Sequence, residues 1–238
     1  MIRDWWREER IAWAQGYICV AGIDEAGRGA LAGPVVAACV VLPSEEAPAG
    51  IDDSKLLSPH ERERLYDAIV RCARGVGIGV SPPELVDSIN VLQATHEAMR
   101  SALADLPPGL VPDVALIDGR PVAPFPIDQV ALVKGDRRSI SIAAASIMAK
   151  VTRDRLMTAY DSDYPGYGFA AHKGYCVPGH LSALSSLGPS PLHRRSFAPV
   201  SQSAEAVASP SGEDGELELN SDTQRKPSSR GRGAGPRG

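Results

Sequence analysis

The chain has 238 residues, 43% of them hydrophobic and 5% aromatic, which is enough apolar material for a sizeable, mainly aliphatic core in one large domain or two small ones. The formal net charge is −4, whereas domains that bind nucleic acid usually carry a net positive charge. A cluster of acids at a metal site would also lower the net charge, so charge alone decides neither for nor against nucleic acid.

The sequence shows no membrane or export signal. The start of the chain is charged and lacks the apolar centre of a signal peptide. No run reaches the roughly 18 apolar residues of a membrane span. The cysteines have no metal-binding or disulfide spacing, and we expect reduced thiols at Cys19, Cys39, Cys72 and Cys176. The sequence therefore predicts a soluble, cytoplasmic protein.

Hydrophobic periodicity predicts alternating strands and helices. One helix start is marked by Ser58, Pro59 and Glu61, which supply an N-cap serine, a first-turn proline and an N3 glutamate. His96 lies on the apolar stripe of a later helix, where we expect a hydrogen-bonded residue at the edge of the core and not a ligand. The predicted elements are a helix at 2–15, strands at 17–24 and 35–42, a helix at 58–74, a strand at 75–80, a helix at 89–106, strands at 114–119 and 130–133, a helix at 139–160 and a short helix ending at Gly188.

This order of elements predicts an α/β fold with a mixed five-stranded sheet flanked by helices. We expect a helical extension at 1–16, a main domain at 17–200 and a disordered low-complexity tail at 201–238. The tail has no aromatic residue and no isoleucine, so it cannot bury enough apolar surface to order itself. The charged residues near the end of the 139–160 helix, Arg153 among them, are most simply interpreted as a solvated face.

Residues 22–29, with the sequence GIDEAGRG, combine acids and glycines where a predicted strand runs into a turn. The carboxylates of Asp24 and Glu25 are costly in an apolar sheet unless they meet a cation or a hydrogen-bond donor. The glycines allow a ligand to approach the backbone closely, and the arginine suits a phosphate. The stretch is compatible with a capped turn carrying two solvated acids, or with a metal-and-phosphate site.

Two more acids follow predicted strands. Asp118 comes directly after an apolar run and precedes a glycine, and Asp136 stands just beyond the fifth strand. Each alone could belong to a turn or a helix start. Together with Asp24 and Glu25 they would repel one another in one cleft unless divalent cations neutralised them, and Mg²⁺ and Mn²⁺ favour oxygen ligands. Adjacent strand residues point to opposite faces, so both acids of the first strand share a site only if the backbone turns there or if Glu25 contributes its carbonyl oxygen.

Residues 22–29, Asp118, Asp136 and the segment 144–154 resemble bacterial ribonuclease HII, the type 2 ribonuclease H family, and the resemblance extends from about residue 17 to residue 197. It implies a ribonuclease H-like fold with a helical C-terminal part. It also implies that the four acids are catalytic and bind Mg²⁺ or Mn²⁺, since a pair of such ions can clamp an in-line displacement at phosphorus.

The resemblance further assigns substrate contacts. In the family the element that corresponds to Gly27, Arg28 and Gly29 contacts the 2′-hydroxyl of a ribonucleotide and the adjoining phosphate. A tyrosine, here Tyr175, packs on the sugar of the following deoxynucleotide. The 2′-hydroxyl is the group that distinguishes RNA from DNA.

The implied activity is metal-dependent hydrolysis of the RNA strand of RNA·DNA hybrids, and nicking of duplex DNA on the 5′ side of embedded ribonucleotides. The products would carry 3′-hydroxyl and 5′-phosphate ends, and the implied roles are ribonucleotide excision and removal of primer RNA. We expect a monomer that binds these nucleic acids and no membrane.

Two other classes of protein compete with this interpretation. A related metal nuclease, such as a junction resolvase or a transposase, would nick substrates made only of DNA. A non-catalytic module would bind hybrids without cutting them, and the complete set of four acids argues against it. Cleavage of a labelled hybrid in the presence of metal separates the three.

Overall fold

The computed structural model describes residues 4–208, with side chains to residue 203. Most of the expected tail, from residue 209 on, lies outside the described residues. The elements are α1 (Arg7–Ala14), β1 (Val20–Ala26), β2 (Val35–Val41), α2 (Pro59–Cys72), β3 (Gly75–Ser81), α3 (Pro83–Ala104), β4 (Val114–Asp118), β5 (Asp128–Leu132), the 3₁₀ helix η1 (Gly135–Arg137), α4 (Ile140–Asp163), α5 (Phe169–His172), α6 (Pro178–Leu187) and α7 (Ala198–Ala208).

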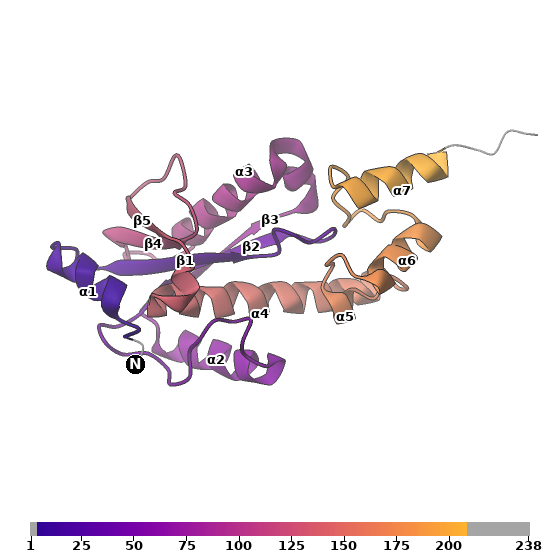
Figure 1. Cartoon of the computed structure of the whole chain (residues 1–238). Helices are drawn as coiled ribbons and strands as arrows, with labels where there is room; N and C mark the ends of the chain where they lie inside the picture. The colour runs from indigo at the N-terminus through magenta and orange to yellow at the C-terminus, as the bar shows by residue number, and fades with distance from the viewer. Residues whose placement is uncertain (1–3, 209–238) are drawn as a thin grey trace, which may run out of the picture. The chain divides into compact units, whose positions relative to one another are not determined.

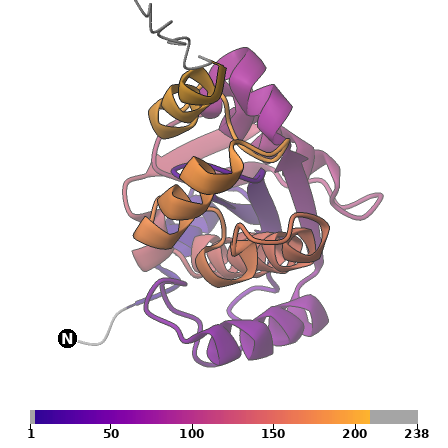
Figure 2. The same ribbon diagram turned by 90° about the vertical axis from the view of Figure 1, so that its right-hand side faces the viewer.

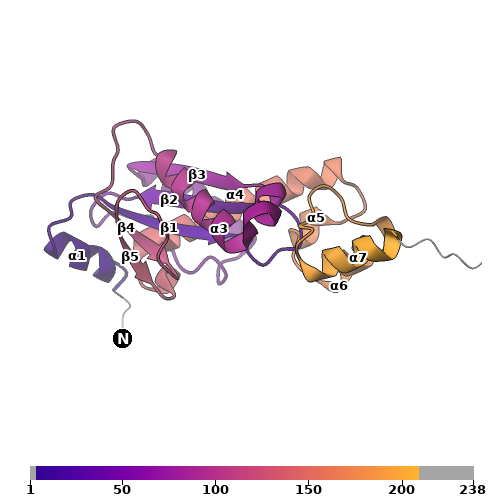
Figure 3. The same ribbon diagram turned by 90° about the horizontal axis from the view of Figure 1, so that it is seen from above.

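The strands form one sheet in the order β3-β2-β1-β4-β5, which Figure 3 shows from above. β1 pairs antiparallel with β2, and β2 pairs antiparallel with β3. On its other side β1 pairs parallel with β4, and β4 pairs parallel with β5. The predicted α/β fold with a mixed five-stranded sheet is confirmed.

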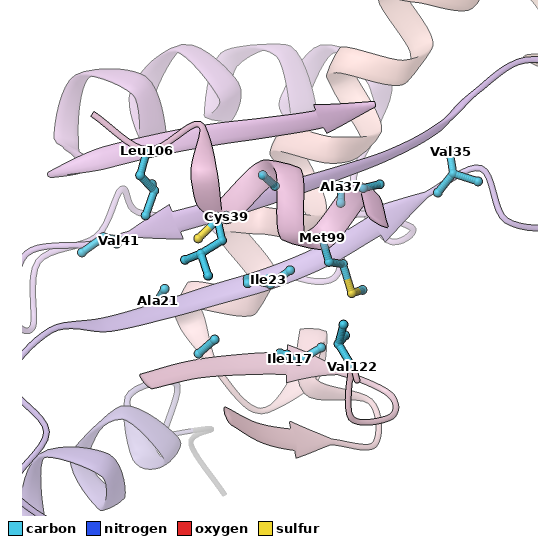
Figure 4. Close-up of a cluster of buried hydrophobic side chains, with 14 of the residues drawn as sticks. Ala21, Ile23, Val35, Ala37, Cys39, Val41, Met99, Leu106, Ile117 and Val122 are labelled. Atoms are coloured by element: carbon cyan, nitrogen blue, oxygen red, sulfur yellow. The ribbon is translucent and has the colours of Figure 1, made fainter. Parts of the chain in front are cut away.

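Helices cover both faces of the sheet. In Figure 1, α3 lies on one face and the long helix α4 on the other, with α2 beyond α4; Figure 2 shows the same layers after a quarter turn. The core between the sheet and α3 contains Ile23, Cys39, Met99 and Ile117 (Figure 4). These side chains come from three strands and one helix, so the centre of the sheet, where β1 lies, is buried on this face.

Helix α3 differs from its predicted extent. It begins at Pro83, well before residue 89, and is interrupted at Asn90, whose φ of 67° and ψ of 161° are not helical. The Asn90 side chain accepts hydrogen bonds from the backbone N–H groups of Leu92 and Gln93, as an N-cap does. The periodic pattern thus located the second half of the helix and missed the proline-led first half. The predicted start of α2 is confirmed, because the serine cap and its reciprocal glutamate bond are both present.

Both ends of the described chain pack on the domain. At the N-terminal end Glu9 is 1% exposed, and its Oε1 accepts hydrogen bonds from the Ser139 hydroxyl at 2.6 Å and the Ser141 N–H at 3.0 Å, at the start of α4. At the C-terminal end α7 runs to Ala208, past the expected boundary at residue 201, and Val200 is buried against Leu31. No helix in the described part of the chain is long and apolar enough to cross a membrane.

Candidate active site

Three of the four predicted acids lie at the same edge of the sheet. Asp24 and Glu25 stand near the end of β1, and Asp118 is the last residue of β4. Because β1 and β4 are parallel neighbours, their carboxyl ends meet at one edge, which is where ligands bind in open α/β sheets. Asp136 joins them from η1, which connects β5 to α4. The structure therefore brings together the acids of three separate segments.

The two acids of β1 project to opposite faces of the sheet. β1 continues to Ala26 without a turn, so its side chains alternate through the pair. Glu25 lines a groove of about 360 Å³ together with Arg28, Asp118 and residues of α3. Asp24 faces α4, where the nearby Ser146 hydroxyl lowers the pKa of its carboxyl group. Because the strand does not turn here, the alternation favours the carbonyl oxygen of Glu25 for a site shared with Asp24.

The acids disfavour one another's charge. Burial raises the pKa of Asp24 well above its usual value, and the charges of Glu25 and Asp118 raise it further. Burial also raises the pKa of Glu25, against the lowering effect of Arg28, and the charge of Asp118 adds to the increase. The pKa of Asp118 is raised first by burial and then by Asp136. A divalent cation would remove this repulsion, and an all-oxygen donor set suits a hard cation.

Protein groups neutralise the acids in this conformation. Lys55 Nζ lies 3.2 Å from Asp136 Oδ2, and Arg28 Nη1 lies 3.0 Å from Glu25 Oε1. Asp118 Oδ1 accepts the Gly135 N–H at 2.6 Å. Within residues 4–208, no three acidic, histidine or cysteine side chains are already arranged as a cation site. The carboxylates fit Mg²⁺ or Mn²⁺ by chemistry, and each of the named contacts uses only one of the two carboxylate oxygens.

Lys55 is a residue of this site that sequence reasoning missed. Residues 52–55 lie between the predicted strand at 35–42 and the predicted helix at 58–74. In the structure Asp53 is fully buried and accepts two hydrogen bonds from the Arg137 guanidinium, at 2.9 and 2.8 Å, which fixes the loop beside η1. Lys55 is thereby held against Asp136. The available signal was two acids, a serine and a lysine clustered between an apolar strand and a capped helix.

The glycine–arginine–glycine element lies just beyond β1, and its two glycines differ in burial and in the space around them. Gly27 is buried at a φ of +94°, and a Cβ there would overlap the side chain of Arg153. Gly29 is exposed, and nothing lies within 4 Å of the position its Cβ would take. The fold thus requires Gly27, whereas the space over Gly29 is open to a ligand.

Tyr175 lies in a different groove, of about 870 Å³, which it lines with Lys150 and Lys173. Lys150 Nζ is 5.6 Å from its ring centroid, and Arg153 Cζ is 5.2 Å away. The tyrosine therefore does not line the groove of the acids, and the predicted recognition residues flank two separate grooves. Lysines on the walls of this second groove suit a nucleic-acid backbone.

Arg153 contradicts the predicted solvated face, because it is fully buried. Its guanidinium donates to the carbonyl oxygens of Pro34 at 2.9 Å, Lys173 at 2.9 Å and Ala32 at 3.1 Å. His96 is buried as expected, at 9% exposure, but its Nδ1 has no hydrogen-bond partner among the described residues, so the prediction that it is satisfied is wrong.

The model of the family described as Ribonuclease HII matches residues 21–200. The chain belongs to the ribonuclease HII family. It is 51% identical over 200 residues to a ribonuclease HII of Geobacter metallireducens, covering 84% of this chain and 93% of that relative. The crystal structure of ribonuclease H2 from Pyrococcus horikoshii OT3 is 27% identical and has a TM-score of 0.67, covering 80% of this chain and 99% of that one.

A more distant structure, that of Bst-RNase HIII in complex with Mn²⁺, shares the fold at 20% identity and a TM-score of 0.62, covering 80% of this chain and 70% of that one. The family, the ribonuclease H-like fold and the enzyme class that the sequence predicted are confirmed: this member of the ribonuclease HII family is a ribonuclease H hydrolase.

Proposed function

We propose that this ribonuclease H hydrolyses the RNA strand of RNA·DNA hybrids with Mg²⁺ or Mn²⁺, and nicks duplex DNA on the 5′ side of an embedded ribonucleotide. The observation that carries the proposal is the convergence of Asp24, Glu25, Asp118 and Asp136 at one sheet edge, where burial and mutual repulsion raise the pKa of the first three. Family membership supports the same activity.

The four acids are the groups that would hold the metal. A bound pair of such ions supplies charge neutralisation, activation of water and stabilisation of the leaving oxygen. Because water and not the 2′-hydroxyl is then the nucleophile, the products carry 3′-hydroxyl and 5′-phosphate ends. Asp24 and Asp136 are each only 4% exposed, and the Asp24 Oδ1 accepts a hydrogen bond from the Glu25 N–H at 2.7 Å. Lys55 Nζ lies 3.2 Å from Asp136 Oδ2, and it would be free to contact a substrate phosphate if that carboxylate held a metal ion.

Gly27, Arg28, Gly29 and Tyr175 are proposed to select the position of the cut. The glycine–arginine–glycine turn presents backbone groups to the 2′-hydroxyl, and Tyr175 packs on the sugar that lacks one. A single ribonucleotide would then be located at an RNA–DNA junction independently of base sequence. This activity suits ribonucleotide excision and removal of primer RNA.

The test is a gel of end-labelled products from three duplexes of one sequence: a uniform hybrid, a DNA duplex with one ribonucleotide, and an all-DNA duplex. We expect Mg²⁺-dependent cutting of the first two only, with a single nick 5′ of the embedded ribonucleotide, and no cutting by Asp24→Asn. Nicking of the all-DNA duplex would favour a resolvase or a transposase. Binding of the hybrid without cleavage in either metal would favour a non-catalytic module.

A further inference from the structure

A second fully buried arginine, Arg194, binds the backbone of the glycine–arginine–glycine element. Its Nη2 donates to the Gly27 carbonyl at 2.8 Å and its Nη1 to the Arg28 carbonyl at 2.9 Å. Nε and Nη2 both donate to the Gly33 carbonyl, at 3.0 and 2.8 Å. Burial lowers the pKa of Arg194 to about 9, with the charge of Arg153 adding to the effect, so the guanidinium stays charged at neutral pH.

By holding the carbonyl groups, these contacts also set the direction of the N–H groups in the same peptide units. In a trans peptide the C=O and N–H groups point in opposite directions, and the peptide bonds after Gly27 and Arg28 are trans. Because Arg194 draws the Gly27 and Arg28 carbonyls into the protein, the N–H groups of Arg28 and Gly29 face outward. Neither N–H has a hydrogen-bond partner within the described chain, and both residues are exposed. Two free donors thus stand beside the open space over Gly29.

Arg153 joins this turn to the segment that carries Tyr175. It binds the carbonyls of Ala32 and Lys173 with two arms of one guanidinium, at 3.1 and 2.9 Å. The Leu31 N–H adds a hydrogen bond to the Gly174 carbonyl at 2.8 Å. The two predicted recognition elements are therefore held to one another through buried backbone contacts.

We propose that Arg194 is a positioning residue for 2′-hydroxyl recognition: by binding the Gly27 and Arg28 carbonyls, it presents the Arg28 and Gly29 N–H groups to the ribonucleotide. The inference rests on the proposed function and deepens it. Only an arginine offers a rigid fork of donors to several carbonyls, whereas lysine offers one compact ammonium. Arg194→Lys therefore replaces the fork of donors by a single amine and releases the orientation of the turn.

The experiment measures the dissociation constants of two labelled duplexes of one sequence, all DNA or with one ribonucleotide, by fluorescence anisotropy with Ca²⁺ in place of Mg²⁺. For Arg194→Lys we expect the preference for the ribonucleotide to fall about tenfold, the equivalent of one lost hydrogen bond, while affinity for the all-DNA duplex is unchanged. The matched control is Arg195→Lys, at the neighbouring exposed arginine, which should keep the wild-type preference.

A preference that is unchanged in Arg194→Lys would overturn the inference, even if the variant is less stable or binds both duplexes more weakly, because that is the signature of a merely structural role. If the wild type does not prefer the duplex with one ribonucleotide over the all-DNA duplex, the proposed recognition of the RNA–DNA junction is wrong. The inference then fails with it.

A measurement on the wild type covers the case in which Arg194→Lys does not fold. In ¹⁵N-labelled protein, the amide signals of Arg28 and Gly29 should exchange rapidly with solvent in the free state. They should shift and become protected with the ribonucleotide duplex, and not with the all-DNA duplex. Protection in the free protein, or the same response to both duplexes, would show that these N–H groups do not read the 2′-hydroxyl.

Discussion

The guanidinium of Arg153 lies over the ring of Tyr175, with 5.2 Å between Cζ and the ring centroid, and the same guanidinium binds the Lys173 carbonyl two residues before the tyrosine. A buried cation thus fixes both the ring and its backbone. In the proposed function, the ring held in this way is the surface on which a deoxyribose packs.

Tyr175→Ala should reduce cleavage of a duplex with one ribonucleotide more than cleavage of a uniform hybrid, because only the former depends on packing against one deoxyribose. Tyr175→Phe keeps the ring and should retain the wild-type ratio. The measurement is kcat/KM for both substrates and all three proteins. An equal loss on both substrates would remove the tyrosine from junction recognition.

The two glycines of the turn should respond differently to alanine. Gly29→Ala should keep the wild-type Tm and lose about tenfold or more of its activity on the single-ribonucleotide duplex, because the methyl group occupies the space of the ligand. Gly27→Ala should lower the free energy of unfolding by more than about 1 kcal/mol, because alanine is strained at a φ of +94° and overlaps Arg153. Thermal unfolding together with the nicking assay separates the two. Full activity of Gly29→Ala would argue against close approach of the substrate at this position.

Asp24→Asn should abolish cleavage and raise the Tm at pH 7 when EDTA is present. The pKa of Asp24 is raised in the folded state from its ordinary value of 3.8, first by burial and then by the charges of Glu25 and Asp118. The free energy of unfolding of the wild type therefore falls as pH rises above about 3.8. The increase in Tm caused by Asp24→Asn should accordingly vanish near pH 4. Millimolar Mg²⁺ should narrow the difference at pH 7 by binding the wild type.

Asp113→Asn is the matched control, because backbone N–H groups of Cys19 and Ile18 lower the pKa of Asp113. Its charge stabilises the fold at pH values above its unfolded pKa, so the variant should lose stability at pH 7 whether or not Mg²⁺ is present. Asp24→Asn with a Tm below that of the wild type in EDTA would contradict the repulsion argument.

His193 should make the fold sensitive to acid. Burial lowers its pKa from 6.5 to about 4, and the charge of His180, whose Nε2 lies 3.1 Å from His193 Nε2, adds to the effect. The unfolded chain then binds the proton more readily, so stability should fall as pH drops from about 6.5 toward 4. His193→Gln should flatten the dependence of Tm on pH in this window, whereas His60→Gln, at an exposed position of α2, should not. Equal slopes in all three proteins would contradict the prediction.

Truncation locates the end of the folded domain. A chain ending at Ala208 should keep the wild-type Tm and cut short substrates normally, since it retains all of α7. A chain ending at Pro199 loses Val200, which is buried against Leu31 and Leu184, and should lose about 1.5–3 kcal/mol of stability. Equal Tm values for the two truncations would restore the boundary near residue 200 that composition alone predicted.

The sequence by itself determined the features that depend on neighbouring residues. Apolar runs that end in acids placed Asp24 and Asp118 at the ends of strands, and Ser58 with Glu61 located the start of α2, because strand ends and helix caps are short-range structures. The parallel pairing of β1 with β4 then brought the two acids to one edge, as the resemblance to the family implied.

Only the tertiary structure decided what holds the recognition turn. Nothing in the sequence marks Arg153 and Arg194 as buried, because both stand beside other charged residues, as surface arginines do. Their acceptors are backbone carbonyls: Pro34 lies 119 residues before Arg153, and Gly27 lies 167 residues before Arg194. Every residue type has a carbonyl group, so such a contact leaves no pattern in the chain. The fold alone brings enough of them together to satisfy a guanidinium out of water.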